Sequence, residues 1–285
     1  MDIREIQLVE LDMLKAFSAL CERHGLRYTI YCGTLLGAVR HGGFIPWDDD
    51  VDVAMPLPDY RRFLTLAHEL PDRFHVQALD NTREYHFLYA KICADGTTFM
   101  PPDMAGLDIH WGISLDIYPF IGAARDPRLE ELQRKLLKMA RYLRSADWHR
   151  FRPGKHPRVE PLLIATPFPI RRVLSDLLLR IAMRDPDKSE RIGTLDAVPF
   201  SGKFSREEWQ KMIRLPFEDT DFPAPAQFDP ILRRMYGDYR QLPPEKDRHG
   251  HSDDTQEYLI DTKRDYRLYQ QDLKSHENSH HIRGL

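Results

Sequence analysis

The sequence contains few cysteines, and their arrangement excludes two classes of structure. There are three, Cys21, Cys32 and Cys93, and they lie far apart without forming a Cys-x-x-Cys pair. An odd number of isolated cysteines does not suit a disulfide framework or a structural zinc site. We therefore expect a protein of a reducing compartment.

Long apolar runs and an excess of positive charge are also missing. No run of about 18 apolar residues occurs, so no membrane-spanning helix is predicted. The N-terminus lacks the apolar core of a signal peptide. A net charge of −3 offers no overall basic surface for nucleic acid. Together these absences predict a cytoplasmic protein that does not bind nucleic acid.

Positive charge is instead concentrated in one segment. Residues 134–158 contain nine Lys or Arg residues and a single acid, Asp147. The segment is either a solvated helix face or a surface for anionic lipid or an anionic glycan, which would place the protein peripherally at the inner face of the cell membrane. The helix predicted next, over residues 170–183, has an apolar face that we expect to pack on the core rather than on a membrane.

The most informative feature is an acidic run, Asp48, Asp49, Asp50 and Asp52, which leads directly into apolar residues. In a strand, the period of two places Asp50 and Asp52 on one face. Asp48 joins them if the extended conformation starts early, and Asp49 points the other way. Carboxylates on one face repel each other unless a cation lies between them, and oxygen ligands suit Mg²⁺ or Mn²⁺. The run predicts a phosphate-handling metal site; the alternative is an acidic turn of capping or solvated aspartates.

Two features elsewhere strengthen the metal hypothesis. Gly33 and Thr34 follow a predicted strand, and the glycine would let backbone N–H groups approach phosphate oxygens. Asp116 stands between apolar residues on another predicted strand, where an unpaired buried charge would be costly. It is the best candidate for a third carboxylate, although an edge-strand aspartate that points at water is the alternative.

Apolar periodicity predicts an α+β protein whose first 120 residues surround one central sheet. Helices are expected over residues 3–24, 35–40, 58–70, 129–143, 170–184, from 205 and over 229–236. Strands are expected over residues 28–32, 50–55, 74–79, 85–94, 97–100 and 112–118. Prolines predict a loop over residues 150–169.

At this point the motifs carry a resemblance to a known family. Residues 31–55, YCGTLLGAVRHGGFIPWDDDVDVAM, closely resemble the LicD/fukutin family. Shorter matches follow in the family's order at residues 89–92, 114–120, 236–239 and 242–244. The resemblance runs from about residue 5 to 255. The cysteine-rich insert of the fukutin-related animal members is missing, which points to the smaller bacterial type.

The resemblance implies a fold and a division of the chain. The family belongs to the nucleotidyltransferase-fold superfamily, so we expect a mixed central β-sheet flanked by helices and a mainly helical C-terminal half. The expected units are a catalytic core at residues 1–125, a helical elaboration that binds donor or acceptor at 126–255, and a C-terminal helix with a frayed tail at 256–285.

The resemblance also implies roles for particular residues. Asp50, Asp52 and Asp116 look like the catalytic carboxylates, and together with Asp48 they look like the ligands of Mg²⁺ or Mn²⁺. Residues expected to bind the donor or its phosphates are Gly33, Thr34, Arg40 and Lys91. The alternative for Lys91 is a surface lysine that snorkels to solvent, and the alternative for Arg40 is a residue that caps its own helix. Residues expected to shape the substrate site are Trp47, Trp111, Tyr236, Asp238, Tyr239, Arg248 and His251.

Bacterial members of the family are best known for moving phosphocholine from CDP-choline onto surface glycans. The resemblance therefore implies metal-dependent transfer of a phospho-alcohol to a hydroxyl of a cell-surface glycan, a lipopolysaccharide precursor or a teichoic-acid precursor, lipid-linked or free, with release of CMP. The alternatives are a nucleotidyltransferase that acts on a sugar, an antibiotic or another small alcohol, and a non-catalytic binding protein with a degenerate site. The motifs alone do not separate these functions.

Overall fold

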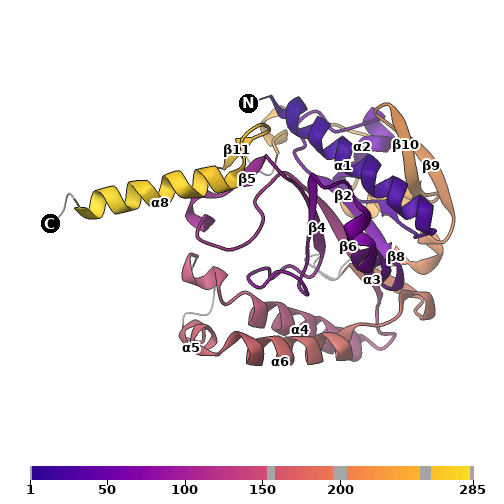
Figure 1. The fold of residues 1–285 in the computed structure, drawn as a ribbon. Helices are drawn as coiled ribbons and strands as arrows, with labels where there is room; N and C mark the ends of the chain where they lie inside the picture. The colour runs from indigo at the N-terminus through magenta and orange to yellow at the C-terminus, as the bar shows by residue number, and fades with distance from the viewer. Residues whose placement is uncertain (1, 153–157, 195–203, 251–257, 283–285) are drawn as a thin grey trace.

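A mixed β-sheet lies at the centre of the molecule (Figure 1). The computed structural model describes residues 2–152, 158–194, 204–250 and 258–282. The main strand order is β1-β2-β6-β4-β3, in which β2 and β6 run parallel and the other pairs run antiparallel. These strands are Thr29–Ile30, Val51–Pro56, Ser114–Gly122, Ala90–Ala94 and Phe74–Gln77, respectively. The predicted α+β class with a mixed central sheet is confirmed.

The register of the three central strands places polar residues in one row. Asp52 on β2 lies opposite Asp116 on β6, and Asp116 lies opposite Lys91 on β4. Because side chains alternate along a strand, this row faces one side of the sheet. The alternate residues of β2 and β6, Val51 and Leu115 among them, are fully buried on the other side.

Two helices cover the apolar side of the sheet, and their side chains belong to the same core as the buried valines. α1 (Ile3–His24) has the predicted bounds and ends at Gly25, whose φ of 60° is the left-handed conformation that favours glycine. α3 (Leu57–Leu66) packs beside it through an edge-to-face contact of Phe17 with Phe63. The apolar pattern of both segments therefore gave the correct elements.

The chain differs locally from the prediction around the glycine motif. The strand expected over residues 28–32 is only Thr29–Ile30, and α2 (Cys32–His41) begins directly after it. Gly33 and Thr34 consequently lie in the first turn of a helix rather than in a loop. Tyr31 is extended and Cys32 has a φ of 43°, so the chain turns from strand to helix within two residues.

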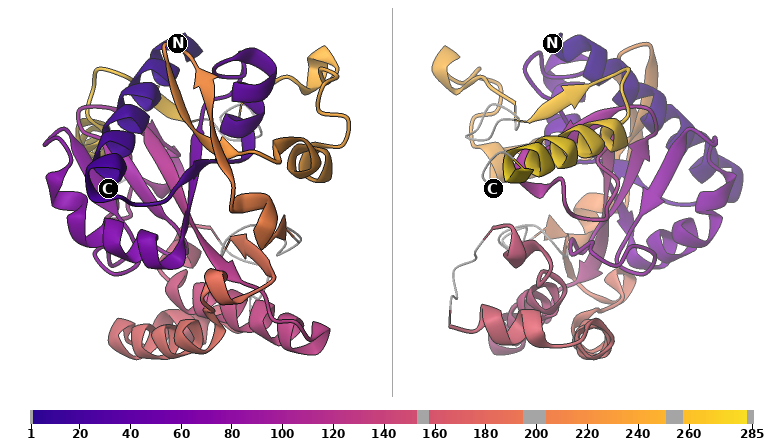
Figure 2. Two further views of the ribbon diagram at one scale, coloured as in Figure 1. Left: turned by 90° about the vertical axis from the view of Figure 1, so that its right-hand side faces the viewer. Right: turned by 60° about the vertical axis from the view of Figure 1, so that its left-hand side comes forward.

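The second half of the chain adds two helices that lie side by side, α4 (Pro127–Arg144) and α6 (Phe168–Ala182). Figures 1 and 2 place them on the side of the molecule farthest from α1. The loop predicted over residues 150–169 is wrong in part, because α5 (Glu160–Ala165) forms there. Its proline lies in the first turn, where no backbone N–H is needed.

Several short strands in the second half were not predicted. β7 (Arg191–Thr194) pairs with the end of β6, and β8 (Phe204–Ser205) pairs with β7. β9 (Met212–Phe217) and β10 (Thr220–Pro225) form a hairpin. This hairpin contains three prolines, which argue against a strand in sequence, yet a two-stranded ribbon has unpaired edges that accept them.

The capping signals predicted two of the remaining helical segments, one of them with a shifted start. The predicted capping box is formed by Ser205 and Glu208. α7 (Phe228–Tyr236) ends before Gly237 as expected, but it begins ahead of Asp229, which is therefore not its N-cap. β5 (Thr98–Met100) pairs with β11 (Leu259–Asp261), and α8 (Tyr266–Ile282) extends away from the body in Figure 1.

Within the described ranges, none of the helices has both the length and the apolar character needed to cross a membrane.

Candidate active site

A pocket of about 1010 Å³ opens over the polar row of the central strands. It brings together most of the residues singled out in the sequence. Those that line it are Gly33, Arg40, Trp47, Asp48, Asp50, Asp52, Lys91, Trp111, Asp116, Tyr236, Asp238 and Tyr239. Thr34 and Arg248 do not line it, and His251 lies outside the described residues.

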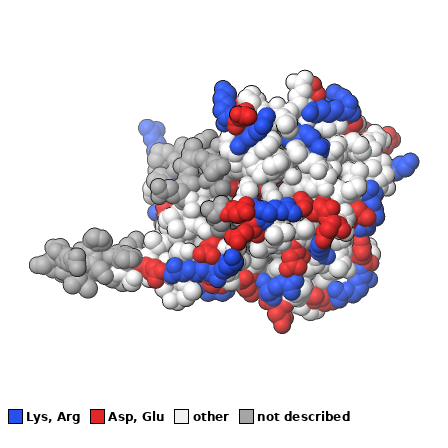
Figure 3. Space-filling model, turned by 90° about the horizontal axis from the view of Figure 1, so that it is seen from above, with Lys and Arg blue, Asp and Glu red and all other residues white. Residues whose placement is uncertain are grey.

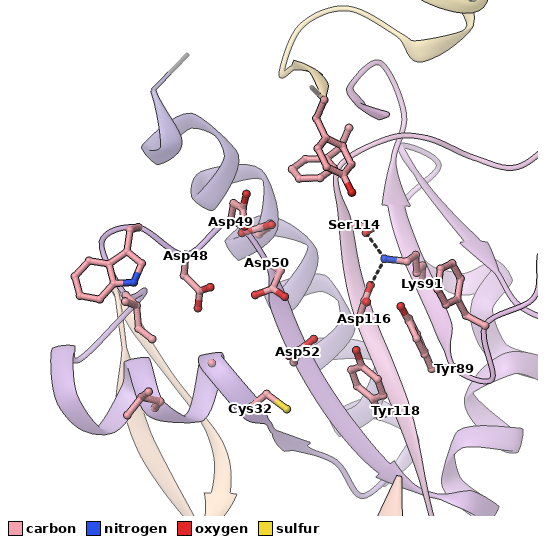
Figure 4. A pocket seen from close by; sticks show the side chains of 18 of the residues that line it. Cys32, Asp48, Asp49, Asp50, Asp52, Tyr89, Lys91, Ser114, Asp116 and Tyr118 are labelled. Carbon is pink, nitrogen blue, oxygen red and sulfur yellow. Dashed lines mark hydrogen bonds and ion pairs between the residues drawn. The ribbon is translucent and has the colours of Figure 1, made fainter. Parts of the chain in front are cut away.

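An ion pair forms one part of the pocket floor. Lys91 Nζ lies 2.6 Å from Asp116 Oδ1 and 3.1 Å from the hydroxyl oxygen of Ser114. Burial by itself lowers the pKa of Lys91, but the attraction of Asp116 outweighs it, so the pKa is raised and the ammonium stays charged. Figure 4 shows this pair on neighbouring strands, across the pocket from Asp50 and Asp52.

Asp52 is the most constrained carboxylate of the floor. It is 6% exposed, and its Oδ1 has no hydrogen-bond partner among the described residues. Burial raises the pKa of Asp52 well above its usual range, and the negative charges of Asp50 and Asp116 raise it further. A buried acceptor without a partner is unfavourable for the fold, and this cost points to a ligand that the carboxylate would bind.

The acidic loop before β2 fits closely against helix α2. A Cβ at Gly33 would lie 2.6 Å from Asp48 Oδ2, so only glycine leaves room for this carboxylate. The carboxylate of Asp49 is packed in the same way against Gly250. Asp50 directly precedes β2 and is not part of it, so the prediction that Asp50 begins the strand is wrong by one residue.

A network that the sequence did not reveal holds the acidic loop from behind. Gln7 on α1 donates from Nε2 to the carbonyl oxygens of Ile45 (3.1 Å) and Asp48 (2.9 Å). Arg4 donates to Gln7 Oε1 and forms a two-pronged pair with Glu218 in the β9–β10 turn. Residues more than 200 positions apart therefore fix one loop, and no local pattern indicates it.

Glu10 is a further pocket residue that the sequence did not reveal. It is 1% exposed on α1, lines the pocket beside the acidic loop, and its Oε2 has no partner among the described residues. Burial raises the pKa of Glu10 well above its usual range, and the charges of Asp50 and Asp48 add to the shift. The available signal was a charged residue on the helix face that also carries Leu14 and Phe17.

Thr34 supports the floor from beneath. Its hydroxyl oxygen accepts a 2.8 Å hydrogen bond from the backbone N–H of Asp52, and its side chain is 4% exposed. Next to it, Cys32 holds a positive φ at the start of α2, a conformation that non-glycine residues keep where the surrounding structure imposes it. The role of Thr34 as a phosphate ligand stays a prediction, because its observed contact is with the strand.

One wall of the pocket is aromatic. Tyr89 makes tilted ring contacts with Tyr118 at 4.5 Å and with Phe87 at 5.2 Å, and Trp111 lies 6.0 Å from Trp148, all distances being between ring centroids. The Nε1 of Trp111 is buried and has no hydrogen-bond acceptor among the described residues. Such a wall offers ring faces to a cation and one unused N–H donor to an oxygen.

Basic and aromatic side chains gather on the opposite side, around α2. Arg40 donates to the carbonyl oxygen of Tyr239 at 2.9 Å, so it ties α2 to the segment after α7 rather than capping its own helix. Burial lowers the pKa of Arg40, and the nearby charge of Arg248 contributes. The Arg248 guanidinium itself lies 5.5 Å from the centre of the Trp47 ring.

The segment after α7 completes this side. Asp238 lines the pocket and accepts a 2.7 Å hydrogen bond from Gln241, and Tyr239 is buried with its hydroxyl donating to Asp229. Tyr236 lines the pocket but remains 42% exposed, so it stands at the rim.

The donor set of the acidic row suits a hard cation, since it consists of carboxylate oxygens and one of them is buried without a partner. As placed, however, no three His, Cys, Asp or Glu side chains within the described ranges form a group that could hold a metal ion. Asp116 is turned toward Lys91 instead. Asp50 and Asp52, with Asp48 beside them, are the residues that would hold an ion.

Comparison with known proteins identifies the family. The family model described as LicD/FKTN/FKRP, nucleotidyltransferase domain, matches residues 25–124, which include the acidic run, Lys91 and Asp116. The lipopolysaccharide cholinephosphotransferase LicD of Haemophilus influenzae is 30% identical over 257 residues, which cover 87% of this chain and 95% of that protein. The chain belongs to the LicD family. It is thus a LicD-type phosphotransferase, and the expected resemblance is confirmed.

More distant LicD relatives match over short stretches. The human and mouse proteins named ribitol 5-phosphate transferase FKRP are each 55% identical over 38 residues, which cover 13% of this chain and only 8% of those proteins.

Proposed function

We propose that this LicD-type enzyme transfers a phospho-alcohol group from a CDP-activated donor to a hydroxyl of a cell-surface glycan, and that the donor is CDP-choline. The observation that supports it best is the charged row of Lys91, Asp116 and Asp52 on the floor of a pocket with an aromatic wall. The relatives named for phosphocholine and ribitol phosphate transfer support the general reaction.

Each side of the pocket has a place in this proposal. The aromatic wall around Tyr89 and Tyr118 would receive the quaternary ammonium group through cation–π attraction. Lys91 would neutralise a phosphate oxygen, and Arg40 would do so from the opposite side. The diphosphate would then lie across the floor, with choline toward the wall and the nucleotide toward α2.

The proposed chemistry is an in-line displacement. The acceptor oxygen attacks the phosphorus that bears the alcohol, a new P–O bond forms, and the bond to the CMP oxygen breaks, so that CMP leaves. Asp116 would take the hydroxyl proton, because burial raises the pKa of its carboxyl although Lys91 opposes the shift. A Mg²⁺ or Mn²⁺ ion, when bound by Asp50 and Asp52, would supply charge neutralisation at the phosphates. The cytoplasmic location stays a prediction.

The direct test uses CDP-choline with a different isotope in each half. Labelled choline phosphate should reach the glycan, and labelled CMP should be released into solution. Removal of divalent cations should abolish both the transfer and the release. Asp116→Asn should reduce the release of CMP by about 10²–10³-fold. Asp108→Asn is a matched control, because Asp108 is exposed and does not line the pocket. Full turnover by Asp116→Asn would contradict the assignment.

Nucleotide transfer is the second candidate, favoured by the description of the matching family model as a nucleotidyltransferase domain. It predicts the reverse labelling, with the cytidine half on the acceptor.

A further inference from the structure

The outward face of helix α6 is apolar. Ile170, Val173, Leu174, Leu177 and Ile181 are between 46% and 67% exposed. Their spacing of three and four residues puts them on one side of the helix, which we name the outer face of α6. The expectation that the apolar side chains of this helix pack on the core is confirmed for Leu179 and Ala182 and is wrong for the outer face.

The inner side of α6 holds the helix to the molecule, with Leu179 and Ala182 in the core and polar contacts beside them. Arg171 is buried and pairs with buried Asp147 at 3.1 Å, and the Ser175 hydroxyl donates to the carbonyl oxygen of Ala140 at 3.0 Å. Arg144 of α4 reaches Asp176 at 2.6 Å. Since these contacts attach the helix through its other side, the outer face of α6 contributes no apolar contact to the core.

Neighbouring helices enlarge the exposed apolar surface. Leu129, Leu132 and Met139 on α4 and Leu162 on α5 are each at least half exposed. Exposed apolar side chains gathered on two helices that pack together commonly mark an interaction site. The opposite side of the molecule, seen in Figure 3, instead carries Lys, Arg, Asp and Glu side chains of mixed sign.

The two helices also carry exposed positive charge. Exposed basic residues occur on both helices: Arg128, Lys135, Lys138, Arg172 and Arg180. On α6 the single acidic residue, Asp176, is already paired with Arg144. A helix that lies along a membrane surface typically has an apolar face flanked by Lys and Arg. The apolar face enters the bilayer, and the cations meet the anionic headgroups.

We infer that the outer face of α6 docks this enzyme onto an anionic lipid bilayer. A second copy of the chain fits less well, because a two-fold contact through this face would bring Arg180 of both copies into the contact, while the one acidic residue of α6, Asp176, is already paired. The bilayer supplies the opposite charge and an apolar layer together. Residues 134–158, the segment first considered for lipid contact, contribute through Lys135 and Lys138.

Docking at this face would also bring the pocket to the membrane. The segment that leaves α4 carries Trp148 and Arg152, and both line the pocket. A glycan attached to a lipid could thus reach the floor of the pocket while its lipid stays in the bilayer. This last step rests on the proposed function, whereas the docking itself does not.

Vesicle binding tests the inference without donor, acceptor or metal, so its outcome is independent of the proposed reaction. The full chain should sediment with vesicles of phosphatidylcholine mixed with phosphatidylglycerol, and less with phosphatidylcholine alone. Val173→Ser with Leu177→Ser should weaken partitioning about tenfold or more. Leu8→Ser with Leu268→Ser is the matched control, because both leucines are about as exposed but lie elsewhere.

A charge variant separates the two contributions. Arg180→Gln should lower binding about fivefold, and only to the vesicles that contain phosphatidylglycerol. Circular dichroism confirms that each variant is folded. The inference is overturned if the full chain binds neither vesicle, if the two double variants bind equally, or if the chain is a dimer in sedimentation that Val173→Ser with Leu177→Ser makes monomeric.

Discussion

The floor of the pocket buries charged side chains, whereas the outer face of α6 exposes apolar ones. Both regions reverse the usual distribution, and each reversal costs free energy that the rest of the fold must supply. The two differ in how they are supported. The floor depends on contacts between distant segments, such as Gln7 with Asp48. Helix α6 is attached through its inner side, where Leu179 and Ala182 join the core and Ser175 donates to a carbonyl oxygen of α4. In the functions proposed above, the buried charge serves chemistry and the exposed apolar surface serves attachment.

The largest predicted effect on stability breaks the ion pair of the floor. Lys91→Met would leave Asp116 without its cation and should lower the free energy of unfolding by about 2–4 kcal/mol. This loss is smaller than that expected for breaking a fully buried ion pair, because the Lys91 side chain keeps 22% of its surface exposed. Urea unfolding measures it. The double variant with Asp116→Asn should regain most of the stability and none of the activity; a double variant as unstable as Lys91→Met would show that the pair is not the cause.

The next effect tests the support of the acidic loop. Gln7→Met keeps the side-chain volume but removes both hydrogen bonds to the loop carbonyls, so it should cost about 1–3 kcal/mol. The variant should also bind Mn²⁺ more weakly in calorimetry, since the loop carrying Asp48 is less fixed. Unchanged Mn²⁺ affinity together with lower stability would limit Gln7 to a structural role.

The smallest effect concerns Glu10 and has a definite sign. Because the pKa of Glu10 is raised in the folded state, the native protein holds this proton more firmly than the unfolded chain. Stability therefore falls as the pH rises from about 4, the unfolded pKa, through the folded value. Glu10→Gln should flatten this fall and raise stability near neutral pH by about 1 kcal/mol without divalent cations. Thermal unfolding across a pH series measures it, and parallel curves for both proteins would refute the explanation.

The elements whose patterns are local could be predicted. The helix over residues 3–24 and the floor residues Asp52 and Asp116 were found because a period of 3.6 or of two is visible in neighbouring residues. Lys91 was found as a charge among apolar strand residues. Its pairing with Asp116 was not, since the register between β4 and β6 is set by segments 25 positions apart.

Other features had no readable signal or a misleading one. The Arg4–Glu218 pair joins residues 214 positions apart in the sequence. The prolines of the β9–β10 hairpin argue against strands there. The amphipathic pattern of α6 showed an apolar face correctly. A pattern does not say whether that face meets the core or the outside, and here polar Ser175 and Arg171 decide it by facing inward.

Asp52→Asn gives the most direct test of the central claim, that the pocket floor carries buried charge for chemistry at the expense of stability. The variant keeps the shape of the side chain and removes the charge. Measured together, the rate of CMP release from CDP-choline should fall about 10²–10³-fold, and the free energy of unfolding without divalent cations should rise by about 1 kcal/mol. A variant that is fully active, or inactive because it is less stable, would contradict the account.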